Sequence, residues 1–186
     1  HLIVYAPICH QVWGGGYLGS MGVLDFAGGA VVHVNSGVAG LVCAIVLGPR
    51  YGYGRDNMAP ANLAFTAIGA GLLFVGWLGF NAGSAGAANG IAAVAALNTI
   101  VAPAAAALGW LVVEWIQHRR PTLLGLLSGI VAGLVAVTPA AGFVDPKGAF
   151  IIGLIAGPIC YLGSSWLKHR LKYDDSLDAW GIHGVG

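Results

Sequence analysis

The chain of 186 residues is 58% hydrophobic and only 8% charged, and its formal net charge is +1. Soluble domains carry about 25% charged residues, so this chain has too few polar side chains to cover a surface that faces water. No basic stretch with interleaved aromatic residues is present, which argues against binding of nucleic acid. The composition predicts an all-α protein embedded in a lipid bilayer.

The first residues do not form a complete membrane span. Residues 1–24 open with the letters HLIVYAP and continue into a Gly-rich stretch around Trp13–Gly22. We interpret them as the tail of an earlier span followed by a loop. The sequence shows neither an initiator Met nor a signal-peptide pattern, so we expect it to be an internal piece of a longer protein.

Five complete apolar segments follow, separated by charged and turn residues. They are Phe26–Gly48, Ala61–Gly83, Ile91–Val113, Thr122–Pro139 and Gly148–Leu167. Each has about 18–23 residues, enough for a helix to cross roughly 30 Å of hydrocarbon. A sixth segment begins near Leu177. We therefore predict that residues 1–186 form one polytopic membrane domain built as a helix bundle.

The basic residues fall almost entirely in alternate loops. The loops at residues 49–60, 114–121 and 168–176 contain Arg50, Arg55, Arg119, Arg120, Lys168, Arg170 and Lys172. The intervening loops contain a single basic residue, Lys147. This alternation supports the assignment of the segments, and the positive-inside rule predicts that the three basic loops face the cytoplasm.

One pair of residues recurs in the chain. Asp25 and His33 are eight positions apart, and so are Asp175 and His183. Five membrane segments separate the start of the first segment from the start of the sixth, so these two cross the membrane in opposite directions. Such an inverted repeat is typical of transporters whose transport site lies between the two halves.

Both histidines lie inside apolar segments. His33 is about eight residues, or roughly 12 Å, from the start of its helix. An ionisable side chain at that depth is unfavourable unless it faces a cavity or a partner. Two neutral imidazoles can hydrogen-bond to each other and line a narrow path for a small polar molecule. Two alternatives stay open: each ring could bond to a nearby carbonyl, or the pair could bind a metal, although no third ligand stands at a recognisable spacing.

Other candidates lie at the outer ends of the first two segments. Asp25 is either a helix N-cap or a buried negative charge that favours a cation nearby. Trp13 can make a cation–π contact, and the oxygen of Ser84 can accept a hydrogen bond from an ammonium-type ion. Phe80 lies in the same stretch as Ser84. The alternative interpretation is interfacial anchoring for Trp13 and Trp77, and helix or lipid packing for Phe80.

Several motifs together resemble one family. The stretches VWGGG, LDFAGGAVVHVNSGVAGL, GWLGFNAGSAG, LLGLLSGIVAGLVAVTPAAGF and DDSLDAWGIHGVG resemble the ammonium transporter, methylammonium permease and Rhesus family, and its bacterial ammonium transporters in particular. The resemblance implies an eleven-helix fold with two inverted five-helix halves, assembled as a homotrimer with one pore in each subunit. This chain would then extend from the end of the fourth helix to the start of the tenth.

The resemblance also implies roles for individual residues. Trp13 and Ser84 match an outer cation-recruitment site, and Phe80 matches the inner of two gate phenylalanines. His33 and His183 match the paired pore histidines, and Asp25 matches the pore-side aspartate. The implied protein is a transporter in the cell membrane and not an enzyme, has no cofactor or metal, and carries ammonium or methylammonium. A PII-type regulatory protein would bind its cytoplasmic loops.

Functions of other classes are alternatives to ammonium transport. A Rhesus-type gas or water channel and an ammonium sensor would share the fold. An intramembrane hydrolase would need a serine paired with a histidine; Ser84, Ser128 and His33 are available, but the GxSG motif is absent.

Overall fold

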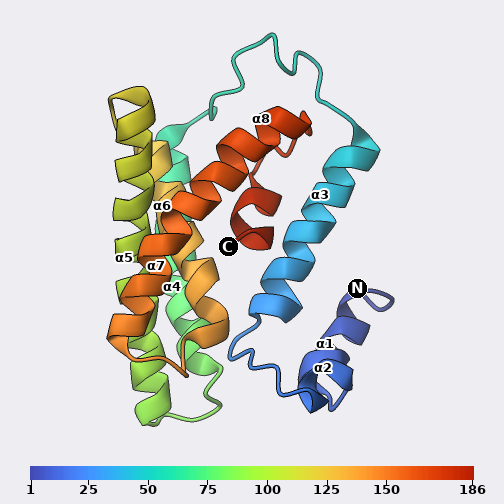
Figure 1. Ribbon diagram of the computed structural model, residues 1–186, viewed down its shortest axis with the longest axis vertical. Coiled ribbons are helices and arrows are strands. Elements are labelled where there is room, and N and C mark those ends of the chain that lie inside the picture. Colours follow the sequence, from blue (N-terminus) through green and yellow to red (C-terminus); the bar gives the residue numbers. More distant parts are fainter.

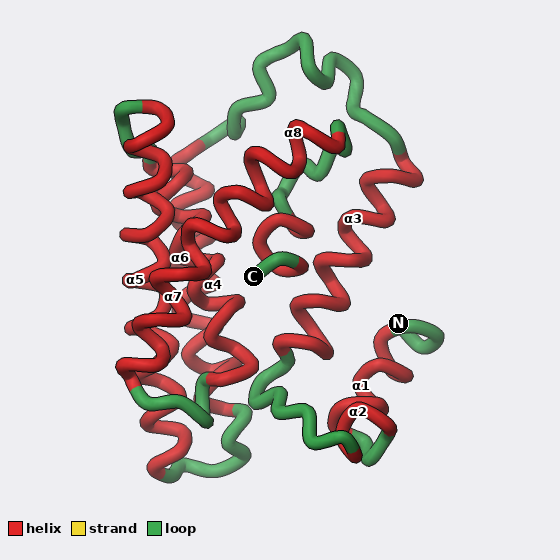
Figure 2. Tube along the Cα trace, in the orientation of Figure 1, coloured by secondary structure: helices red, strands yellow, loops and turns green.

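The structure is a computed structural model that describes residues 1–186 and contains helices and loops but no strand (Figures 1 and 2). The all-α prediction is therefore confirmed. The chain begins with two short helices, α1 (Tyr5–Trp13) and α2 (Tyr17–Ser20). They lie beside the start of the first span (Figure 1).

Five helices are long and apolar enough to cross a membrane. The first consists of the π-helical turn η1 (Gly29–Val34) and α3 (Asn35–Leu47), and the second and third are α4 (Leu63–Gly83) and α5 (Gly90–His118). The fourth consists of α6 (Leu123–Val137) and the 3₁₀ turn η2 (Thr138–Ala140). The fifth consists of α7 (Pro146–Leu162), the π-helical turn η3 (Gly163–Leu167) and α8 (Lys168–Leu171). The sixth predicted segment is the π-helical turn η4 (Trp180–Gly184). The five predicted spans are confirmed.

The predicted boundary at Val113 is wrong. Helix α5 continues to His118, so part of the predicted loop at residues 114–121 is helical. The charge on Glu114 suggested the end of an apolar segment, but this side chain is buried. Its carboxylate accepts hydrogen bonds from the backbone N–H and the hydroxyl of Thr122, at 2.8 and 2.7 Å. A buried charge that is fully bonded can lie within a helix.

Helices α5, α6 and α7 form the tightly packed part of the bundle. Glycines bring their backbones together: a Cβ atom at Gly129 would lie 2.8 Å from the Cα of Ala107, and one at Gly133 would lie 2.6 Å from the carbonyl oxygen of Ala102. Small residues allow membrane helices to approach this closely. The C-terminal turn η4 lies between α3 on one side and α6 and α7 on the other, and it contacts all three helices (Figure 1).

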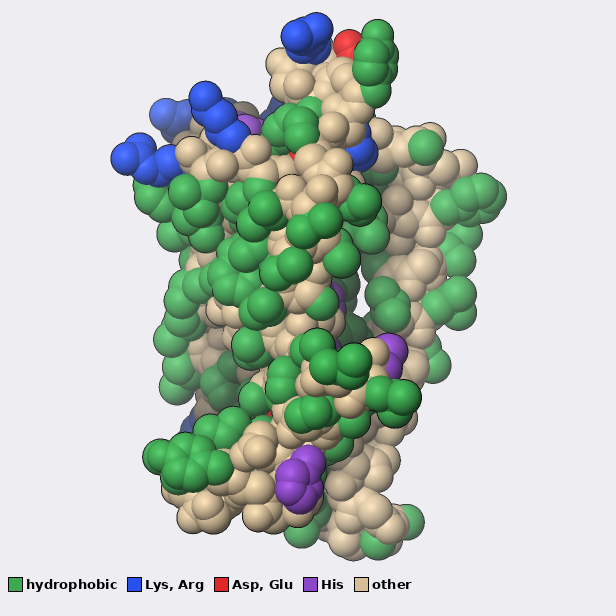
Figure 3. All heavy atoms as spheres, turned by 90° about the vertical axis from the view of Figure 1, so that its right-hand side faces the viewer, with side chains coloured by type: hydrophobic (Ala, Val, Ile, Leu, Met, Phe, Trp, Pro, Cys, Tyr) green, Lys and Arg blue, Asp and Glu red, His purple; other side chains and the backbone are tan.

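The basic loops gather at one end of the bundle. The loop after α3, the turn after α5 and the segment after α8 lie at the same end in Figure 1, and Lys and Arg side chains cluster at that end in Figure 3. Lys147 lies at the start of α7, at the opposite end. The predicted alternation of loops is therefore present in the fold.

Candidate functional site

The two histidines meet between the α3 segment and the C-terminal turn. His33 lies in η1 and His183 in η4, and their Nδ1 atoms are 3.1 Å apart. Their ring centroids are 5.2 Å apart. At this distance one Nδ1 donates a hydrogen and the other accepts it, so the two neutral rings adopt different tautomers. The contact expected from the spacing of the two Asp–His pairs is present.

An aspartate precedes each of these π-helical turns. The Asp25 carboxylate is buried and accepts hydrogen bonds from the backbone N–H groups of four residues, at 2.9, 2.5, 2.9 and 3.1 Å; they are Gly28, Gly29, Ala30 and Val31. Asp175 accepts one from the N–H of Trp180 at 2.8 Å. Asp25 therefore holds the first N–H groups of η1 from three residues before Gly28, which occupies the N-cap position of that turn. Each carboxylate oxygen of Asp25 thus accepts two backbone N–H groups, so both oxygens are occupied within the protein.

Two aromatic side chains of α4 lie against the histidine pair. The indole of Trp77 stacks on His33 with centroids 5.1 Å apart and an angle of 17° between the planes, and it lies 6.4 Å from His183. Phe80 lies 5.9 Å from His33 in a tilted orientation. Trp77 is only 8% exposed, so its interpretation as an interfacial anchor is wrong. The sequence offered one signal: Trp77 and Phe80 are three residues apart and share a helix face.

An open apolar pocket of about 490 Å³ adjoins His33. It is lined by η1 and by one face of α4, including His33, Trp77 and Phe80. The Nε2 atom of His33 is buried and has no hydrogen-bond partner within the protein. An unpaired buried nitrogen is unfavourable, so it is well suited to bond a small polar molecule that enters the site.

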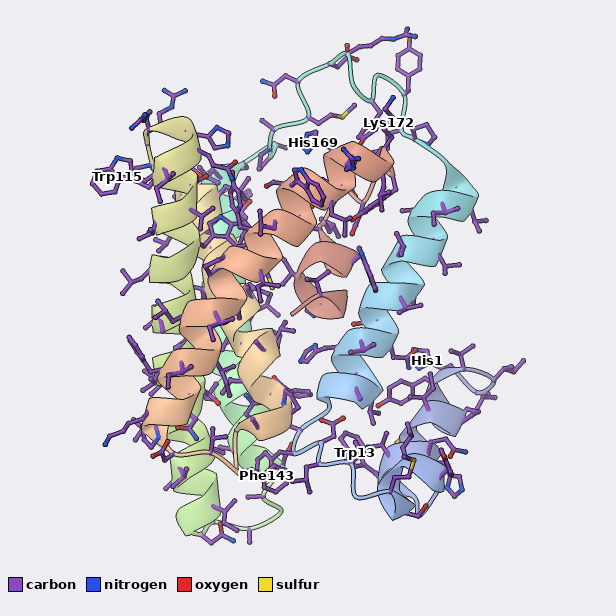
Figure 4. All side chains as sticks on the ribbon, viewed as in Figure 1. His1, Trp13, Trp115, Phe143, His169 and Lys172 are labelled. Carbon is purple, nitrogen blue, oxygen red and sulfur yellow. The ribbon has the colours of Figure 1, made fainter.

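Trp13 and Ser84 lie at the end of the bundle opposite the basic loops. Trp13 is 47% exposed, and its indole N–H donates to the backbone oxygen of Asp25 at 2.8 Å. Figure 4 shows it beside the loop that leads into η1. Ser84 is exposed at the end of α4, and its hydroxyl donates to the backbone oxygen of Phe80 at 2.8 Å. Each residue is thus connected to an element that contacts His33, but no hydrogen bond joins the two.

The side chains around the pair form neither a cluster of three metal ligands nor a serine–histidine hydrogen bond. No group of three His, Cys, Asp or Glu residues is close enough together to hold a metal ion, whereas zinc sites use three or four protein ligands. The Ser36 hydroxyl donates to the backbone oxygen of His33 and not to its ring. No hydrogen bond joins a serine hydroxyl to an imidazole ring.

A cluster of ion pairs lies at the basic end, next to the His183 segment. The guanidinium of Arg50 donates two hydrogen bonds to Asp174, at 2.8 and 2.7 Å, and Lys168 pairs with Asp178. The bonds from Arg50 hold the pKa of Asp174 below its usual value. Burial raises the pKa of Asp178 and outweighs the opposing effect of Lys168. Because Asp174 precedes Asp175, this cluster connects the loop after α3 to the turn that carries His183.

Comparison with known proteins gives one consistent result. The family model of the Ammonium Transporter Family matches residues 1–186. An ammonium transporter of Bacillus subtilis is 54% identical over 186 residues, which are 99% of this chain and 45% of that protein. A crystal structure of Saccharomyces cerevisiae Mep2 is 43% identical with a TM-score of 0.91 and covers 99% of this chain and 43% of that one.

A further solved structure, titled "Sensor Amt Protein", has a TM-score of 0.91 at 33% identity and covers 98% of this chain and 48% of that one. The chain spans about half the length of the relatives it matches. Five helices of the chain are long and apolar enough to cross a membrane, and the family model matches every residue. This chain therefore belongs to the ammonium transporter family.

Proposed function

We propose that the protein containing this chain moves ammonium across a membrane and conducts it as ammonia past His33 and His183. The observation that carries the proposal is the contact of 3.1 Å between the two imidazoles, made by two equivalent turns beside an open apolar pocket. The relative from Bacillus subtilis supports the proposal because it is named an ammonium transporter.

The physical reason for carrying the neutral molecule is the cost of desolvation. An unpaired ammonium ion in an apolar passage loses many kcal/mol of hydration. The ion is therefore recruited at the end of the bundle near Trp13 and Ser84, where an aromatic face and a hydroxyl oxygen can replace water. At this solvent-exposed end the ion gives one proton to water, which leaves ammonia and hydronium, and the neutral ammonia continues past Phe80 to the histidine pair.

The histidine pair conducts best when both rings are neutral. Two imidazolium ions whose nitrogens are 3.1 Å apart would repel each other strongly in these apolar surroundings. With both rings neutral, the Nδ1 contact holds them in place, and the remaining ring nitrogens can exchange hydrogen bonds with ammonia. Ammonia has both a lone pair and N–H donors, so it can use either partner.

The test is uptake of labelled methylammonium by cells that lack their own transporters and express the full-length protein. We expect saturable uptake that unlabelled ammonium inhibits by competition. Uptake that rises linearly with concentration would instead favour a Rhesus-type gas channel. A sensor role is the second candidate, because a solved relative with the same fold is titled as a sensor; it predicts substrate binding with negligible flux.

The proposal also includes an orientation, which rests on the positions of the basic residues, and an assembly, which rests on the family. The loops at residues 49–60, 114–121 and 168–176 face the cytoplasm, the protein resides in the cell membrane, and three copies form a homotrimer. A cysteine placed at Arg55 of the full-length protein should resist an impermeant thiol reagent added outside intact cells, and it should react after the cells are opened. Ready labelling from outside would reverse the orientation.

A PII-type signalling protein is the proposed regulatory partner. Its contact surface would be the basic end of the bundle, where exposed Lys and Arg side chains gather (Figure 3). A pull-down from cells grown with excess nitrogen should recover such a protein with the wild type. Recovery should fall when Arg55 and Arg119 are replaced by Ala, and an unchanged yield would place the contact elsewhere.

A further inference from the structure

We infer that Thr138 is a positioning residue for transport: its hydroxyl fixes the indole of Trp77, which holds the ring of His33 in place. This inference rests on the proposed conduction past the histidine pair. Thr138 follows α6, at the start of η2, and contributes no atom to the histidine pair itself. Its effect on His33 passes through Trp77.

The hydrogen bonds of Thr138 leave its hydroxyl no freedom. The side chain is fully buried, and its oxygen donates to the backbone oxygen of Leu134 at 2.7 Å. The same oxygen accepts the indole N–H of Trp77 at 2.9 Å. An indole has one N–H donor and no acceptor, so this bond is the one that sets the rotation of the Trp77 ring. Loss of the acceptor would leave a buried donor unpaired.

The orientation of Trp77 constrains both histidines. Its plane is 17° from that of His33 and 22° from that of His183, with centroid distances of 5.1 and 6.4 Å. Rings that are stacked and buried cannot rotate independently, because the interior is close-packed. A turn of the indole would therefore displace the His33 ring and disturb the contact between the two Nδ1 atoms.

A second buried threonine provides a matched control. Thr99 in α5 donates to the backbone oxygen of Ala95 at 2.6 Å and accepts from the amide of Asn81 at 3.1 Å. Like Thr138, it is fully buried and links its own helix to a side chain of α4. Asn81, however, makes no ring contact with either histidine. Loss of the Thr99 hydroxyl should cost comparable packing without moving the pair.

The experiment measures methylammonium uptake by the full-length protein with Thr138→Val, Thr138→Ser or Thr99→Val. We expect Thr138→Val to lower the maximal rate about five- to tenfold, as loss of one positioning hydrogen bond would, with KM unchanged. Thr138→Ser keeps the hydroxyl and should retain most of the rate. Thr99→Val should behave like the wild type. An unaltered rate in Thr138→Val, or an equal loss in Thr99→Val, would overturn the inference.

A spectroscopic measurement separates positioning from general stability. In protein labelled with 5-fluorotryptophan, the ¹⁹F resonance of Trp77 is assigned from its absence in Trp77→Phe. This resonance should shift in Thr138→Val and stay in place in Thr99→Val. A loss of uptake without a shift would contradict the role assigned to Trp77. The spectrum needs no transport, so it tests positioning even if the wild type fails to take up methylammonium, a result that would count against the proposed function.

Trp77→Phe covers the case in which Thr138→Val does not assemble. This change removes the indole N–H and keeps an aromatic ring beside His33. It should lower the maximal rate in the same way, and adding Thr138→Val to it should bring no further loss, because both changes remove one interaction. Losses that multiply in the double variant would show that Thr138 and Trp77 act separately.

Discussion

The segments around His33 and His183 have the same arrangement of residues but differ in the number of hydrogen bonds that hold them and in their burial. In each, an aspartate eight residues before the histidine accepts backbone hydrogen bonds at the start of the π-helical turn that contains the histidine. Asp25 accepts four backbone hydrogen bonds, whereas Asp175 accepts one. His33 is buried beneath Trp77, and His183 is partly exposed. The repeat therefore supplies two equivalent rings, of which the first is the more rigidly placed.

The neighbours of the two aspartates differ in charge. The backbone oxygen of Asp25 accepts from the indole of Trp13, whereas that of Asp175 accepts from the ammonium of Lys168 at 3.4 Å. Lys168 also pairs with Asp178. At one end an aromatic face is available to a cation, and at the other end a protein ammonium already occupies the equivalent place. This difference in charge supports the proposed recruitment of ammonium at the Trp13 end.

Replacement of the histidines should have the largest effect on transport. We expect His33→Ala and His183→Ala each to reduce methylammonium uptake more than tenfold, because either change removes the contact between the two rings. His33→Glu keeps a group that can carry a proton, and it should retain partial transport with altered ion preference. Uptake assays provide the measurement, and native sizing of the proposed trimer checks that the variants assemble.

The comparison between the two histidines is sharpened by their surroundings. His33→Ala also removes the ring that stacks on Trp77, worth about 1 kcal/mol, so this variant should melt at a lower temperature than His183→Ala. Unchanged uptake and selectivity in both variants, with assembly preserved, would refute conduction past the pair.

The two aspartate caps should differ in their contribution to stability. Asp25→Ala leaves four N–H groups without their acceptor and should lower the free energy of unfolding by about 3 kcal/mol. Asp175→Ala removes one such bond and should cost about 1 kcal/mol. Thermal unfolding of the full-length protein in detergent measures both, and equal effects would show that the number of capping bonds does not distinguish the two segments.

The sequence was sufficient to predict the spans and the histidine contact. Long apolar segments allow few alternatives to membrane helices, and the repeated spacing of Asp25–His33 and Asp175–His183 identifies equivalent positions in two halves. The Asp25 cap was predictable because a capping residue acts within a few positions of itself along the chain. These features depend on local patterns or on symmetry.

The remaining parts of the site depend on contacts between distant residues. Trp77 and Thr138 are 61 positions apart, and no pattern in the chain joins them. The burial of Glu114 depends on Thr122, which lies beyond the turn that follows α5. A single sequence shows that an indole or a carboxylate is present, but the partner that satisfies it is known only once the helices are packed.

The ion pair of Arg50 and Asp174 should show a pH dependence found only at the His183 end. Asp174 has a lowered pKa in the folded protein because Arg50 bonds to its ionised form. Its contribution to stability is therefore fully present above the unfolded-state pKa of about 4 and is lost as the pH falls through the lower folded-state value. Asp174→Asn should lower the melting temperature by a few degrees at pH 7, and the difference from wild type should disappear at strongly acidic pH. A difference that persists there would mean that the Asp174 charge is not responsible.

Ser84→Ala should have the smallest effect and should act at the recruitment end alone. The Ser84 hydroxyl donates its hydrogen to the backbone oxygen of Phe80, so the lone pairs of its oxygen stay available to an ammonium ion. One such hydrogen bond contributes about 1 kcal/mol, so KM for methylammonium should rise about two- to fivefold with the maximal rate unchanged. Ser20→Ala is the matched control, because Ser20 is also exposed and donates to the backbone oxygen of Tyr17. A fall in the maximal rate with KM unchanged would mean that the Ser84 hydroxyl acts at a later step than recruitment. An equal rise of KM in Ser20→Ala would mean that the Ser84 hydroxyl has no specific role in recruitment.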